Sequence, residues 1–145
     1  MTLEDRIKEE EGFRLAPYDD ATGKALRPGD TLQGNITIGW GTNLSSGISL
    51  MSAQYLLSER LAVAQLDAAA VFGRVEFYSF PQKCQEAFLD MLYQMGRKRF
   101  MTFKKMIEAA KRNDWKSVKR EALDSEWARG KHKTRAEEIG ALFDG

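Results

Sequence analysis

The chain has 145 residues, of which 43% are hydrophobic and 30% are charged, and its formal net charge is +1 at pH 7. This length is sufficient to bury a hydrophobic core in one domain, and the composition is neither that of a disordered chain nor that of a collagen-like one. The single cysteine, Cys84, and the single histidine, His132, exclude an internal disulfide and a zinc site built from Cys and His alone.

The first predicted element is a short helix over residues 3–11. Thr2 can cap its start and Gly12 provides a stop signal. From residue 15 to residue 44 the helical period disappears, and glycine and proline separate short segments such as residues 36–40. This pattern is typical of hairpins, and it predicts a small β-rich lobe.

Beyond residue 49 the apolar residues recur at intervals of three and four, which predicts helices. Serine, threonine and glycine mark several of their ends. The predicted elements are a long helix that reaches Gly73, a helix capped by Ser79 that stops at Gly96, helices around Phe103 and Val118, and a last helix capped by Thr134.

These elements predict an α+β fold in a single domain of residues 1–145. The β-rich lobe would hold residues 13–48, and residues 1–12 together with residues 49–145 would form the helical lobe. A long helix would join the two lobes. Such an arrangement leaves a cleft in which a long substrate can lie.

Glu11 has the properties of a proton donor. Hydrolysis of a glycosidic bond needs such a donor and a second carboxylate. Glu11 follows Glu9 and Glu10 at a helix C-terminus, where the helix dipole and like charges both disfavour ionisation. Charged helix ends are also common and often merely solvated.

Asp19 and Asp20 lie in a turn-like stretch, where aspartates are frequent because they cap turns.

Three motifs combine these residues in a specific order: Glu11-Gly-Phe-Arg-Leu, then Tyr18 and Asp20, then Thr37-Ile-Gly-Trp-Gly. Together they resemble the signature of glycoside hydrolase family 24, the phage lysozymes or endolysins. The resemblance implies that Glu11 is the acid, and that Asp20 and the Thr37 hydroxyl hold a water that attacks with inversion. The two carboxyl groups would then lie roughly 6.5 to 9.5 Å apart.

The resemblance continues through the C-terminal part of the chain and implies a lysozyme-like fold. The segment Met-Leu-Tyr-Gln-Met-Gly around Gln94 resembles the helix that lines the substrate cleft of the family, so that Tyr93 and Gln94 would face the sugar. Gly41 would contribute backbone contacts to the substrate. Arg135 would approach Glu11 as a supporting charged partner.

Two aromatic residues have a structural alternative. Trp40 lies between two glycines of the predicted hairpin, and a flat ring beside a cleft can stack on a pyranose. Tyr93 lies next to an apolar face rich in methionine and is equally compatible with a core position. We keep both as candidate substrate contacts.

The spacing before Thr37 departs from the family pattern. Sixteen residues separate Asp20 from Thr37, whereas the compact pattern has about five, so residues 24–35 resemble an insertion in the β-rich lobe. The longer segment also brings Thr22 and Thr31 into the neighbourhood. The assignment of Thr37 therefore depends on treating this segment as an inserted loop.

The implied activity is that of an N-acetylmuramidase, which cleaves the β-1,4 bond between N-acetylmuramic acid and N-acetylglucosamine in bacterial cell walls. Such an enzyme needs no metal and no cofactor, and its partner is the glycan strand of peptidoglycan. A lytic transglycosylase, which forms an anhydro sugar, is the nearest alternative. Asp20 and Thr37 favour hydrolysis, because a transglycosylase positions no water. We expect a monomer.

A non-catalytic module that binds polyanions or cell walls is the alternative from a different class. Residues 97–135 hold fourteen Lys or Arg and five Asp or Glu, and Phe100, Phe103 and Trp115 interleave with the charges. The helical spacing of these aromatic residues favours core positions. We therefore expect no nucleic-acid partner.

No stretch of the sequence approaches the roughly 18 apolar residues that cross a bilayer, so we expect no stable membrane insertion. The first residues are charged (Glu4, Asp5 and Arg6), where a signal peptide would be apolar. We therefore expect synthesis in the host cytoplasm. The protein would then reach periplasmic peptidoglycan through a membrane lesion, or would act as part of a virion.

Overall fold

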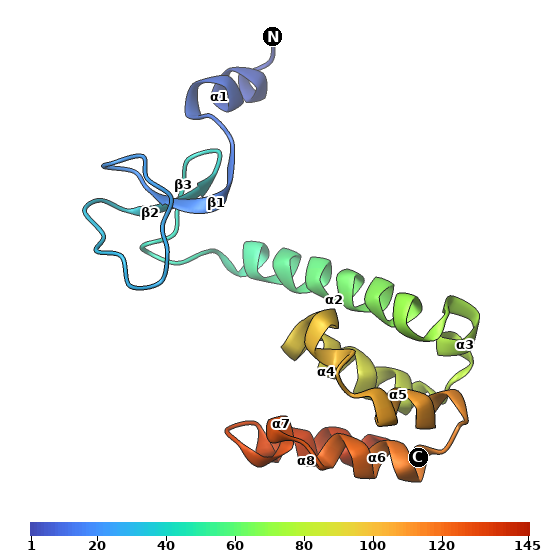
Figure 1. Cartoon of the computed structure of the whole chain (residues 1–145). Helices are drawn as coiled ribbons and strands as arrows, with labels where there is room; N and C mark the ends of the chain where they lie inside the picture. Colours follow the sequence, from blue (N-terminus) through green and yellow to red (C-terminus); the bar gives the residue numbers. More distant parts are fainter. The chain divides into compact units, whose positions relative to one another are not determined.

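The computed structural model describes all 145 residues and has the predicted α+β composition (Figure 1). The chain forms two compact units, residues 1–54 and residues 55–145. The first unit holds a helix and a three-stranded antiparallel sheet, and the second is helical. The predicted grouping of residues 1–12 with the helical lobe stays a prediction.

Helix α1 (Leu3–Glu11) has the ends that the sequence predicts. The Thr2 hydroxyl accepts the backbone N–H of Asp5 at 3.1 Å, and the Asp5 carboxylate accepts the backbone N–H of Thr2 at 2.9 Å. This reciprocal pair satisfies two amides at the helix start. Gly12 leaves the helix with φ 71°, a conformation that suits glycine. Glu11 is therefore the last residue of the helix.

The sheet follows directly and consists of β1 (Arg14–Asp19), β2 (Ile36–Gly39) and β3 (Thr42–Asn43) in that order. All neighbouring strands are antiparallel, and Tyr18 on β1 pairs with Thr37 on β2. The register thus brings the segment around Asp20 beside the start of β2. The predicted hairpins are confirmed.

The second part of the chain is helical, as predicted. None of its helices is both long and apolar enough to cross a membrane. The elements are α2 (Leu50–Phe72), α3 (Arg74–Ser79), α4 (Gln82–Phe100), α5 (Lys104–Lys111), α6 (Trp115–Leu123), α7 (Glu126–Arg129) and α8 (Lys133–Leu142).

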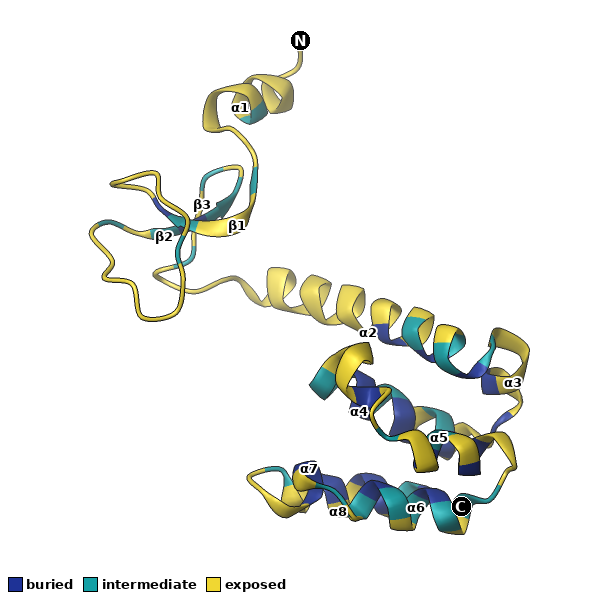
Figure 2. Ribbon diagram, in the orientation of Figure 1, coloured by how far each residue is buried: buried dark blue, intermediate teal, exposed yellow.

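The hydrophobic core lies among these helices (Figure 2). Phe88 on α4 is fully buried, and its ring lies 4.8 Å from that of Phe72 and 5.1 Å from that of Phe143. α2 contributes Ala64, Ala68 and Phe72, which are spaced by four residues and form one buried stripe. Cys84 is also buried, and burial raises the pKa of its thiol. This agrees with a packing role for Cys84.

Two predicted helix caps are wrong. Ser79 ends α3, where its hydroxyl donates to the Glu76 carbonyl at 2.6 Å, and Pro81 takes the capping position of α4. Thr134 lies inside α8, which begins at Lys133 and has no side-chain cap. In both places a short polar side chain resembles a cap in sequence, but the backbone begins its helix elsewhere.

Candidate active site

The Glu11 carboxylate lies against the backbone of the β2–β3 turn. A side-chain Cβ on Gly41 would lie only 2.4 Å from Glu11 Oε2 and would force the carboxylate to move. Gly41 also has φ 74°, which disfavours other residues. The missing side chain of Gly41 thus leaves the space that Glu11 occupies, and the backbone contact of Gly41 with the substrate stays a prediction.

Trp40 precedes Gly41 and stacks on Phe13. The ring centroids are 4.5 Å apart, with planes 30° from parallel. The Lys8 ammonium lies 4.8 Å from the centroid of the same indole ring. Trp40 is 43% exposed, and its stacking on a sugar stays a prediction.

Asp19 has a structural role at the end of β1. Its carboxylate is 2% exposed and accepts backbone N–H groups from Gln33 at 2.7 Å and from Ala21 and Gly34 at 2.9 Å each. These hydrogen bonds, with that from Gln33 the strongest, hold the pKa of Asp19 below the usual aspartate value. Asp19 therefore ties the end of the loop that resembles an insertion back to β1.

Asp20 is exposed, and its partner is Asn35. The backbone N–H of Asn35 donates to Asp20 Oδ1 at 2.7 Å, and the Asn35 side-chain amide donates to Asp20 Oδ2 at 3.2 Å. Thr37 is 4% exposed, and its hydroxyl donates to the Asn35 carbonyl at 3.2 Å. Asn35 thus links Asp20 to Thr37.

Asn35 was not among the residues that the motifs indicated. Its signal in the sequence is weak, because it is an asparagine after glycine that lies two residues before Thr37. The backbone N–H of Asp20 also donates to the Asn35 carbonyl, at 3.1 Å. Asp20 and Asn35 therefore pair where the loop leaves β1 and where it returns to β2. The length of the loop between them does not separate Asp20 from the segment that holds Thr37.

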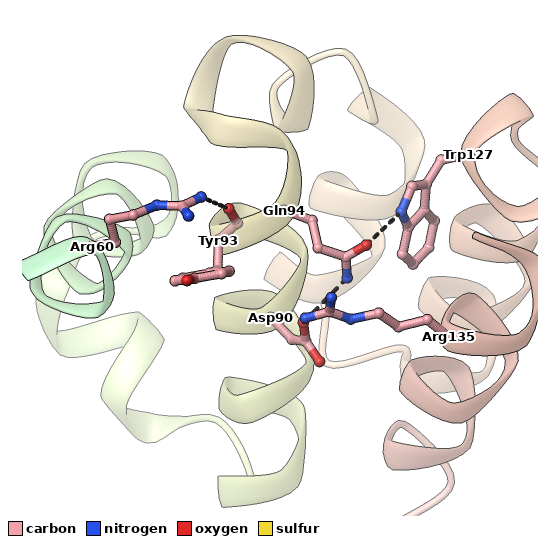
Figure 3. Close-up of polar contacts among 6 residues, drawn as sticks. All are labelled: Arg60, Asp90, Tyr93, Gln94, Trp127 and Arg135. Carbon is pink, nitrogen blue, oxygen red and sulfur yellow. Dashed lines mark hydrogen bonds and ion pairs between the residues drawn. The ribbon is translucent and has the colours of Figure 1, made fainter. Parts of the chain in front are cut away.

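In the second unit, both the oxygen and the nitrogen of the Gln94 side-chain amide have hydrogen-bond partners (Figure 3). Its amide oxygen accepts the indole N–H of Trp127 at 3.2 Å, and its amide nitrogen donates to Asp90 Oδ1 at 3.1 Å. An indole N–H can only donate, so the orientation of the Gln94 amide is fixed. One amide hydrogen remains for another acceptor. Arg135 also donates to Asp90 Oδ1.

Tyr93 is half-buried and contacts Arg60 of α2 (Figure 3). The guanidinium carbon lies 4.0 Å from the ring centroid, and Nη2 donates to the Tyr93 carbonyl at 2.8 Å. Gly96 has φ 76° and breaks the helical path of α4, which agrees with the predicted stop there. Arg60, Tyr93 and Gln94 line a cavity of about 350 Å³.

The predicted site residues thus form groups within each unit. Glu11 lies beside Gly41, and Asp20 is linked to Thr37. Gln94 and Arg135 share Asp90. The approach of Arg135 to Glu11 stays a prediction. No three His, Cys, Asp or Glu side chains converge as metal ligands would.

Comparison with known protein families gives a match over most of the chain. Residues 8–138 match the family model described as phage lysozyme, a span that includes all the residues discussed above from Lys8 to Arg135. No curated protein matches the chain. Phage lysozymes are glycoside hydrolases that degrade peptidoglycan. With this match over most of its length, the chain belongs to the phage lysozyme family and is a muramidase of the phage type.

Proposed function

We propose that the chain hydrolyses the β-1,4 bond between N-acetylmuramic acid and N-acetylglucosamine with inversion at the anomeric carbon. Glu11 is the general acid, and Asp20 with Thr37 holds the attacking water. The observation that carries this proposal is the hydrogen-bonded group Asp20–Asn35–Thr37, because it leaves both candidate water ligands as acceptors.

The water-binding step follows from the hydrogen-bond partners. The Thr37 hydroxyl uses its only hydrogen on the Asn35 carbonyl, so its oxygen has lone pairs left to accept. The Asp20 carboxylate accepts two hydrogen bonds from Asn35 and has capacity for more. A water that donates one hydrogen to each oxygen directs its own lone pair away from both. That lone pair is then free to attack the sugar.

The acid step depends on Glu11. Its carboxylate is at the exposed end of α1 and beside Gly41, which has no side chain. A protonated Glu11 gives its proton to the oxygen that leaves with N-acetylglucosamine as the C–O bond breaks. The water loses a proton to Asp20 as it forms the new bond, so charge and atoms balance. The next turnover needs only proton exchange with solvent.

The residues of the second unit would contribute binding. Gln94 has one free amide hydrogen in a fixed direction, which suits a carbonyl acceptor such as that of an N-acetyl group. Tyr93 offers a ring whose one face is covered by Arg60. These contacts would position the glycan strand without taking part in bond cleavage.

The test is release of reducing sugar from purified cell walls by Glu11→Gln. This variant keeps the shape of the side chain and removes the acid, so we expect at least about a hundredfold loss of rate. Glu10→Gln is the matched control, because it removes the same charge from the same helix end, and it should retain activity. Near wild-type activity of Glu11→Gln would show that another residue is the acid.

The form of the product separates the alternatives. Mass spectrometry of the digested glycan should find reducing ends that carry the added water. Anhydro ends would instead indicate a transglycosylase. If the wild-type chain binds cell walls without cleaving them, and the binding falls steeply with salt, the polyanion-binding alternative holds.

A further inference from the structure

The aromatic pair Phe13–Trp40 lies on the two chain segments that meet at Glu11. Phe13 comes two residues after Glu11, and Trp40 comes immediately before Gly41, whose backbone lies against the Glu11 carboxylate. The two rings stack at 4.5 Å. The stack therefore joins the exit of α1 to the turn between β2 and β3.

Trp40 also contacts α1 on the other side of Glu11 along the chain. The Lys8 ammonium, one helical turn before Glu11, lies 4.8 Å from the indole centroid, within cation–π range. Lys8 is further held by an ion pair with Glu4 at 2.5 Å. One indole ring thus contacts residues on both sides of Glu11.

Few other contacts fix the end of α1 within the first unit. α1 has no buried residue, and the buried apolar residues of the chain begin at Ala64. Gly12 has φ 71° and no side chain, so the backbone between Glu11 and β1 has more conformational freedom than another residue would give it. Without the Trp40 indole, the direction of the last turn of α1 would depend mainly on the pairing of β1 with β2, which begins at Arg14.

We propose that Trp40 and Phe13 form a clamp that positions Glu11 for proton transfer. This inference rests on the proposed function, because it assigns the clamp to the acid of that mechanism. Trp40 then acts through Glu11 and is a positioning residue, instead of a platform for sugar stacking. Phe13 covers one face of the indole, which leaves less of the ring for a pyranose.

The two roles of Trp40 predict different kinetics. A sugar platform contributes to binding of the substrate, so its loss raises KM. A clamp holds the acid at the distance that the transition state needs, and a small displacement of an acid greatly lowers the rate. Loss of the clamp therefore lowers kcat and leaves KM nearly unchanged.

The experiment measures kcat and KM of Trp40→Ala, Phe13→Ala and the double variant on soluble peptidoglycan fragments. We expect kcat to fall about tenfold or more in each single variant, with KM within about twofold of the wild type. The double variant should be no slower than the slower single variant, because both substitutions remove one contact. Trp40→Phe keeps a stacking ring and should recover most of kcat.

Leu15→Ala is the control, because Leu15 is an exposed apolar residue of β1 in the same unit and should leave both constants unchanged. Should Trp40→Ala not fold, as judged by circular dichroism, Phe13→Ala removes the same stack and carries the test. A rise in KM at constant kcat would overturn the clamp, as would losses that multiply in the double variant, or unchanged constants in both single variants. Glu11→Gln separates the two proposals: if it is inactive while the clamp variants are normal, only the clamp is wrong.

Discussion

Asp19 and Asp20 are neighbours with identical side chains, and the backbone around them gives each a different role. Asp19 is buried and accepts three backbone N–H groups, two of them from residues 33 and 34 at the far end of the loop. Asp20 is exposed and accepts only from Asn35. The tendency of aspartate to cap turns thus explains Asp19, whereas the exposed Asp20 carboxylate keeps capacity for a further hydrogen bond, as the proposed mechanism needs.

The lowered pKa of Asp19 predicts acid sensitivity. Because the folded-state pKa is below the unfolded one, ionised Asp19 stabilises the fold above the ordinary aspartate pKa of about 3.9. This stabilisation is lost as the pH falls through the folded value. Asp19→Asn should therefore be less stable than the wild type at neutral pH, and the difference should shrink between about pH 5 and pH 2.

Urea unfolding across this pH range measures the effect. Asp20→Asn is the matched control, since it changes the same charge one residue later. It should lose less stability at neutral pH than Asp19→Asn, because the Asp20 side chain is exposed and is hydrogen-bonded only to Asn35, but it should lose most activity. A constant difference between Asp19→Asn and wild type over the whole range would contradict the assignment of Asp19.

At the scale of elements, helix α2 supplies a hydrogen-bond donor where α4 is broken at Gly96. A continuous helix would pair the Tyr93 carbonyl with the backbone N–H of Arg97, but the Gly96 conformation interrupts this path. Arg60 of α2 donates to that carbonyl instead, and its charge lies near the negative end of the first helical segment. Arg60 thus stabilises the end of the segment that holds Tyr93 and Gln94.

Replacing Arg60 by methionine should lower the free energy of unfolding by about 1 kcal/mol, because a cation–π contact and a carbonyl partner are lost. The melting temperature should fall by roughly 3 °C. Arg74→Met is the control, since Arg74 is an exposed arginine without these contacts, and it should cause no such fall. Equal melting temperatures for the Arg60 variant and wild type would show that the contact does not stabilise the fold.

The sequence predicts elements well where the signal is local. The Thr2 cap of α1 and its Gly12 stop depend on residues within a few positions of each other, and both are confirmed. The Ser79 hydroxyl bonds the helix before it instead of the helix after it, and α8 begins one residue before Thr134. The predicted stop at Gly96 is a break within α4, and Phe100, which was predicted for the next helix, is the last residue of α4.

At the scale of the whole molecule, the buried apolar residues lie in the second unit, around a cluster of aromatic rings. Phe88 contacts aromatic rings from four other helices or helix ends, including Phe72 and Trp115. Phe88→Ala should lower the free energy of unfolding by about 4 kcal/mol, because it leaves a cavity in a close-packed core. Val75→Ala, at an exposed position, should change it by less than about 0.5 kcal/mol. Urea unfolding compares the two, and a small effect of Phe88→Ala would contradict the central place of this residue.

The candidate site was only partly visible in the sequence. The order of Glu11, Asp20 and Thr37 was visible because the motifs keep it along the chain. The partners that orient them were not, because Asn35 lies fifteen residues from Asp20, and Phe13 lies far from Trp40 in sequence. Such contacts depend on strand register and loop closure, which residue spacing does not determine.

The attack of water with inversion is the central claim, and proton NMR during digestion tests it most directly. The substrate bond has the β configuration, so attack from the far side releases N-acetylmuramic acid as the α-anomer first. We predict that the α-anomer appears before mutarotation, that its release is abolished in Glu11→Gln and that it persists in Glu10→Gln. Initial release of the β-anomer, or of an anhydro sugar without an anomeric hydroxyl, would contradict the mechanism.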